Sequence, residues 1–88
     1  MIARQYLVSG RVQGVGFRFF AEAAGIRAGL FGWVRNLPDG RVEIFAQGSA
    51  NDFPSFEREI RRGPPGARVG DVDVSGARLE DLAGFDIR

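Results

Sequence analysis

The chain of 88 residues contains no cysteine, no histidine, no lysine and no threonine. The lack of cysteine excludes a disulfide framework, an iron–sulfur cluster and a thiol nucleophile. The lack of histidine removes the commonest general base and the commonest transition-metal ligand. The lack of lysine excludes Schiff-base chemistry and a lysine-type phosphate loop. Any catalysis must therefore use arginine, carboxylates, amides, hydroxyls and backbone groups.

Charge is balanced, with 12 arginines against 11 acidic residues and a formal net charge of +1. This balance does not indicate a general nucleic-acid binder. Arginine stays charged and cannot shuttle protons, but its guanidinium binds phosphate or carboxylate in a bidentate way. The length fits one small domain over residues 1–88, which we expect to be a monomer.

Long apolar runs are also missing. No run of ~18 apolar residues predicts a membrane span. The N-terminal residues lack the apolar stretch and the small-residue cleavage site of a signal peptide. We therefore expect the protein in the cytoplasm.

Apolar periodicity changes repeatedly between the strand period and the helix period along the chain. Glycine and proline clusters at residues 37–40 and 63–66 mark a hairpin turn and a helix stop. We expect strands at residues 6–10, 30–36, 41–47, 69–74 and 85–87, and helices at 17–28 and from about 51 to 62. This β-α-β-β-α-β order with one additional short strand predicts an α+β ferredoxin-like sandwich, an antiparallel sheet with two helices on one face.

Each predicted helix carries an apolar stripe. In the second helix the stripe consists of Phe53, Phe56 and Ile60, and Pro54 fits only in the first turn. Gly25 lies inside the first helix, where glycine costs about 1 kcal/mol relative to alanine. The stripe of the first helix follows the i, i+3, i+4, i+7 spacing and consists of Phe17, Phe20, Ala21, Ala24 and Ala28.

The glycine-rich connection between the first strand and the first helix is a candidate anion site. Gly14 and Gly16 allow positive φ and close approach of a ligand to the backbone. The following helix begins at Phe17, and its free N–H groups and dipole favour an anion. Arg18 stands in its first turn, where the guanidinium can close on the same anion. The same spacing also fits a tight turn that needs glycine, with Arg18 solvated.

Asn36 is a second candidate, because it ends a strand directly before the turn at residues 37–40. An asparagine in such a place either serves a ligand or makes local hydrogen bonds. Trp33 and Phe45 fall on one face of the predicted hairpin. They either stack on a ligand or simply cover the sheet.

Two longer motifs resemble the signatures of a known family. The first is residues 8–18, VSGRVQGVGFR. The second is residues 32–36, GWVRN, followed by residues 40–42, GRV, and by Gly48. In order and spacing they resemble the two signatures of the acylphosphatase family, and the similarity runs over essentially the whole chain.

This resemblance implies a metal-independent enzyme without cofactors or a covalent intermediate, which hydrolyses acyl phosphates to a carboxylate and inorganic phosphate. Matching positions make Arg18 the phosphate-binding residue and Asn36 the residue that holds the attacking water. The expected partners are a small acyl phosphate, such as acetyl phosphate, and inorganic phosphate as product and inhibitor. Backbone N–H groups expected to bind the phosphoryl group belong to Gln13, Gly14, Val15, Gly16, Phe17 and Arg18.

Two binding functions remain open beside the enzyme, since a ferredoxin-like fold does not define a function. An RNA-binding module needs aromatic and basic side chains together on the central strands. Here Phe45 and Tyr6 are scattered, and the net charge is near zero. A regulatory domain would bind phosphate or another anion without turnover. Hydrolysis of acetyl or benzoyl phosphate separates the enzyme from both.

Overall fold

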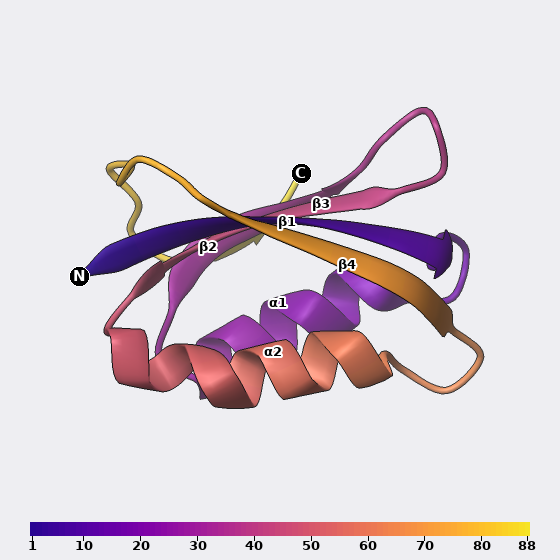
Figure 1. Ribbon diagram of the computed structural model, residues 1–88, viewed down its shortest axis with the longest axis horizontal. Helices are drawn as coiled ribbons and strands as arrows, with labels where there is room; N and C mark the ends of the chain where they lie inside the picture. The colour runs from indigo at the N-terminus through magenta and orange to yellow at the C-terminus, as the bar shows by residue number, and fades with distance from the viewer.

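The computed structural model describes residues 1–88 as two layers, a five-stranded sheet and a pair of α-helices (Figure 1). Neither helix has the length and apolarity needed to cross a membrane. The elements follow in the order β1 (Ile2–Arg11), α1 (Phe17–Arg27), β2 (Phe31–Asn36), β3 (Val42–Gly48), the short 3₁₀ helix η1 (Ala50–Asp52), α2 (Phe53–Arg62), β4 (Arg68–Gly76) and β5 (Phe85–Ile87).

The strands lie in the order β4-β1-β3-β2-β5, and both helices pack against one face of the sheet (Figure 1). β1 runs antiparallel to β3 and β4, and β2 runs antiparallel to β3. This arrangement confirms the ferredoxin-like prediction. β5 adds to the edge parallel to β2, so the complete sheet is mixed. Alternation in the sequence reports which face a side chain takes and says nothing about the direction of the neighbouring strand.

The main core fills the space between the sheet and the helices. α2 contributes Phe53, Phe56 and Ile60, which are fully buried and confirm the predicted stripe. Tyr6 of β1 and Ile44 of β3 are fully buried in the same cluster. Burying a large apolar side chain stabilises the fold by about 1.5–3 kcal/mol relative to leaving it exposed. The layer beneath the sheet is therefore held chiefly by hydrophobic burial.

α1 approaches the sheet closely through small residues. Ala21, Ala24 and Gly25 are all buried on this face. A Cβ placed on Gly25 would lie 2.4 Å from ring atoms of Phe85 in β5. Glycine is required here by packing, and Gly25 is not a defect of the helix. The close approach of Phe85 offsets the helix-propensity cost.

The opposite face of the sheet is partly covered by the segment between β4 and β5. Trp33 and Phe45 stack on each other there, with ring centroids 5.9 Å apart and an interplanar angle of 12°. The Gln47 side chain exchanges two hydrogen bonds with the main chain of Glu80, at 2.7 and 2.8 Å, and so holds the segment down. The two rings are only 8% and 3% exposed. They stack on each other and cover this face of the sheet.

Element boundaries differ most at the first strand. β1 begins at Ile2, although the sequence pattern predicted a strand only from Tyr6. β1 pairs on both sides, with β3 and with β4. The hydrogen bonds to both neighbouring strands extend β1 over Arg4 and Gln5. These residues are both polar, so the alternation of apolar and polar residues did not predict a strand there.

Candidate active site

The connection between β1 and α1 is a short loop at residues 12–16. Gly14 and Gly16 have φ values of 74° and 78°, in the left-handed region that favours glycine. A Cβ on either glycine would meet no atom within 4 Å. The backbone conformation, and not crowding within the protein, therefore requires glycine here. The open space beside the loop leaves its backbone accessible to a ligand.

No side chain caps the N-terminus of α1, which opens onto this loop. The N-cap residue is Gly16, which has no side chain, and no acidic residue lies in the first turn. The first intrahelical hydrogen bond runs from Phe20 N to Gly16 O over 3.1 Å. The N–H groups of Phe17, Arg18 and Phe19 precede this bond and have no acceptor within the helix. Together with the positive end of the helix dipole, they favour an anion at this place.

Arg18 extends from the first turn of α1 toward Arg88. Its Nη1 donates to the main-chain oxygen of Arg88 over 3.3 Å. Arg88 is itself held by a hydrogen bond from its N–H to Val34 O, at 2.8 Å, and its guanidinium lies 4.7 Å from the centroid of the Trp33 ring. A guanidinium carries five N–H groups. Most of the Arg18 donors therefore stay available to an anion.

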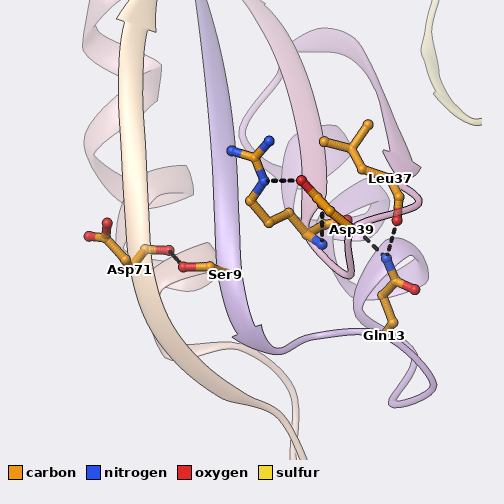
Figure 2. A network of polar contacts seen from close by, with 6 residues as sticks. Ser9, Gln13, Leu37, Asp39 and Asp71 are labelled. Carbon is orange, nitrogen blue, oxygen red and sulfur yellow. Dashed lines mark hydrogen bonds and ion pairs between the residues drawn. The ribbon is translucent and has the colours of Figure 1, made fainter.

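Gln13 links the loop to the hairpin between β2 and β3. Its Nε2 donates to the carbonyl oxygens of Leu37, at 2.9 Å, and Arg41, at 3.0 Å (Figure 2). Leu37 N also donates to Arg41 O over 2.8 Å. The Gln13 side chain therefore binds both ends of the hairpin turn, directly after Asn36. Sequence reasoning had assigned only the backbone of Gln13 to the site and missed this bridge.

Asp39 stabilises the same turn (Figure 2). Its Oδ1 accepts a hydrogen bond from Arg41 N, at 3.0 Å, and its Oδ2 accepts one from Arg41 Nε, at 2.9 Å. The backbone hydrogen bond from Arg41, with smaller contributions from the guanidinium, holds the pKa of Asp39 below its ordinary value of 3.8. The carboxylate is thus ionised at neutral pH and engaged within the turn.

A pocket lies between the N-terminus of α1 and the end of β2. Asn36 is the last residue of β2, where it pairs with Val42 of β3, and it borders this pocket. Its side chain is exposed and makes no hydrogen bond to another protein group. The pocket has a volume of about 120 Å³. It is lined by Val12, Gln13, Gly14, Gly16, Phe17, Arg18, Phe19 and Asn36.

The structure thus brings Arg18 and Asn36 to one pocket, although they lie on different elements. Val15, whose backbone N–H the sequence assigned to phosphate binding, packs its half-buried side chain against the core. Phe19 lines the pocket and was missed. The sequence did contain a sign that Phe19 could line the pocket. Phe19 lies outside the predicted apolar stripe of α1, which indicates that its aromatic side chain is exposed directly after Arg18.

Comparisons with known proteins agree with this geometry. The sequence model of the Acylphosphatase family matches residues 4–87. The acylphosphatase of Koribacter versatilis is 51% identical over 85 residues, which span 96% of this chain and 77% of that protein. The acylphosphatase of Anaeromyxobacter sp. is 52% identical over 83 residues, spanning 93% and 89%. The crystal structure of acylphosphatase from Bacillus subtilis matches with a TM-score of 0.96 at 43% identity, covering 100% of this chain and 99% of that one.

The two-layer fold, with an uncapped helix N-terminus beside Arg18, defines a small α+β protein. The match over nearly the whole chain is more specific, and the chain belongs to the acylphosphatase family. The reaction of this family is the hydrolysis of acyl phosphates, which are mixed anhydrides of a carboxylic acid and phosphoric acid.

Proposed function

We propose that this chain hydrolyses acyl phosphates in the pocket between Arg18 and Asn36, and that it does so without a metal ion. The observation that carries the proposal is the convergence of three features at that pocket. They are the uncapped N-terminus of α1, the guanidinium of Arg18 and the side-chain amide of Asn36. Family membership supports the reaction, and the geometry supports the role of each group.

The phosphoryl group binds at the N-terminus of α1. Backbone N–H groups of residues 13–18 and the Arg18 guanidinium donate to its oxygens. The backbone N–H groups of residues 13–16 are free for this, because none of them donates to a backbone carbonyl. Phosphoryl transfer needs charge stabilisation and positioning more than covalent help from the protein. Donors fixed by the loop and the helix supply that stabilisation without reorganising during the reaction.

Asn36 holds the attacking water. Its amide has no protein partner and reaches the pocket from β2, whereas Arg18 reaches it from α1. The water attacks phosphorus in line with the departing acyl oxygen, so a bond from phosphorus to the water oxygen forms as the bond to the acyl oxygen breaks. The acyl group leaves as a carboxylate. The proton of the water passes to a phosphoryl oxygen of the substrate, because no histidine or carboxylate lines the pocket.

The donor groups present support the proposal of metal independence. No three acidic, histidine or cysteine side chains converge anywhere in the chain, so it offers no cage of protein ligands for Zn²⁺ or Ca²⁺. No carboxylate lines the pocket to hold Mg²⁺ on the substrate phosphate. Asp39, the carboxylate of the neighbouring turn, already binds Arg41 through both oxygens. The Arg18 guanidinium takes the place of a cation.

The decisive experiment is release of inorganic phosphate from acetyl phosphate by the purified chain, with and without excess chelator. We expect turnover at the same rate in both conditions and competitive inhibition by added inorganic phosphate. Loss of activity in chelator that added magnesium restores would overturn metal independence. Absence of turnover with both acetyl and benzoyl phosphate would overturn the function itself.

A single domain over residues 1–88, a monomeric state, a cytoplasmic location and the absence of a nucleic-acid partner complete the proposal as predictions from the sequence. Size-exclusion chromatography with light scattering tests the oligomeric state. A mass near that of one chain, 9.6 kDa, is expected.

A further inference from the structure

Phe19 is an exposed aromatic side chain at the rim of the candidate active site. It follows Arg18 in the first turn of α1, lines the same pocket as Asn36, and is 66% exposed. Val12 and Phe17, the other apolar residues of the lining, are 1% exposed and belong to the core. Phe19 is therefore the apolar residue of the pocket that a bound ligand can cover.

The proposed reaction places an acyl group on the open side of this pocket. In an in-line displacement, the entering water and the departing acyl oxygen lie on opposite sides of phosphorus. With the phosphoryl group at the N-terminus of α1 and the water at Asn36, the acyl group points away from Asn36. It leaves the cradle toward solvent, and Phe19 is the exposed apolar residue of the lining that it can cover.

We propose that Phe19 forms an acyl-group subsite, so that the protein favours acyl phosphates with an apolar, above all aromatic, acyl group over those with a small one. The inference rests on the function proposed above. An aromatic acyl group gains from covering the Phe19 ring and from edge or offset stacking on it. Covering roughly 55 Å² of apolar surface, at about 25 cal/mol per Å², corresponds to about a tenfold gain in affinity.

Ile26 provides a matched control on the same helix. It lies two turns after Phe19, is 60% exposed, and does not line the pocket. Substituting either residue with alanine removes a large exposed apolar side chain from α1. Only the change at Phe19 alters the pocket.

The experiment compares benzoyl phosphate with acetyl phosphate for the parent protein, Phe19→Ala, Phe19→Tyr and Ile26→Ala. For Phe19→Ala we expect KM for benzoyl phosphate to rise about tenfold with kcat unchanged, because contact with the acyl group acts equally on ground and transition states. Acetyl phosphate kinetics and the inhibition constant for inorganic phosphate should stay within about twofold. Phe19→Tyr should retain the preference, and Ile26→Ala should behave as the parent protein.

Three results would overturn the subsite. Equal losses on both substrates in Phe19→Ala would assign Phe19 to support of the loop. Unchanged kinetics on both substrates would show that the acyl group does not touch the ring. A loss of the same size in Ile26→Ala would indicate a general effect on α1. In each case turnover of acetyl phosphate by the parent protein would leave the proposed function standing, whereas no turnover of either substrate would remove both proposals.

Discussion

The side-chain amide of Gln13 donates a hydrogen bond to the carbonyl oxygen of Leu37 over 2.9 Å. This contact joins the loop before α1 to the residue directly after Asn36. A second hydrogen bond from the same nitrogen, to Arg41 O at 3.0 Å, holds the other side of the turn. The two halves of the candidate active site are thereby fixed to each other through one side chain.

Removing the hydrogen bonds from the Gln13 side chain should disturb the position of the attacking water more than the binding of phosphate. For Gln13→Ala we expect kcat for acetyl phosphate to fall by on the order of 10–10², because a displacement of about 1 Å at a reacting group costs that much. The inhibition constant for inorganic phosphate should change less than about threefold, since Arg18 and the backbone N–H groups remain. Gln13→Glu, which cannot donate when ionised, should lower kcat as Gln13→Ala does, and its added negative charge beside the pocket should also weaken phosphate binding. An equal loss of phosphate affinity in Gln13→Ala would contradict the positioning role.

Arg18 and Asn36 should separate by role in the same assays. Arg18→Ala should abolish turnover and weaken phosphate inhibition together, because the guanidinium binds the phosphoryl group throughout the reaction. Arg18→Lys should recover little, since an ammonium does not reproduce a bidentate fork. Asn36→Ala should lower kcat by on the order of 10²–10³ while phosphate still binds.

The measurements are kcat and the phosphate inhibition constant, with circular dichroism to confirm folding of each variant. Loss of phosphate affinity in Asn36→Ala as severe as in Arg18→Ala would show that Asn36 does more than hold water. An active Arg18→Ala would refute the assignment of the site.

Gly25→Ala should destabilise the protein despite the better helix propensity of alanine. Alanine gains about 1 kcal/mol in a helix, but its Cβ would lie 2.4 Å from the buried ring of Phe85. Overpacking of this kind costs about 1–3 kcal/mol, and the rigid ring cannot turn away cheaply. We expect urea denaturation to show a lower free energy of unfolding.

Gly76→Ala is the matched control, since a Cβ there meets no atom within 4 Å. Combining Gly25→Ala with Phe85→Leu should cost less than the sum of the two single changes, because the smaller side chain relieves the clash. A Gly25→Ala variant more stable than the parent protein would disprove the packing role of Gly25.

Tyr6, the single tyrosine of the chain, should make stability depend on alkaline pH. Its hydroxyl donates to Glu57 Oε2 over 2.7 Å, and that oxygen also accepts a hydrogen bond from Arg4 Nη1 at 2.6 Å. Burial, followed by the hydrogen bond to Glu57, raises the pKa of Tyr6 above its ordinary value of 10.0. The unfolded chain therefore loses the tyrosine proton at a lower pH than the folded one.

The contribution of Tyr6 is complete below about pH 10 and declines above it, because ionisation then favours the unfolded state. Tyr6→Phe should lose about 1–2 kcal/mol of stability near neutral pH and show a weaker decline toward high pH. Denaturant titrations near pH 8 and pH 11 measure both effects. Tyrosinate absorbance that rises near pH 10 while the protein is still folded would contradict the raised pKa.

Features that depend on neighbours in the chain could be read from the sequence. Periodicity predicted the helices and strands and the buried stripe of Phe53, Phe56 and Ile60, since a regular element repeats its burial along the sequence. The need for glycine at positions 14 and 16 was also readable, because positive φ is a local property of the backbone. Residues in two motifs of known spacing indicated the family.

Features that depend on residues distant in the chain appeared only in the folded structure. The ring of Phe85 requires glycine at position 25. The carbonyl oxygens of Leu37 and Arg41 are the acceptors of the Gln13 side chain. β5 pairs parallel with β2. The spacing of residues along one segment does not show which other segment it will contact. Those contacts are set when the sheet and the helices pack together. The family resemblance implied that Arg18 and Asn36 serve one substrate, whereas the place of Phe19 in the lining of their pocket became visible only in the fold.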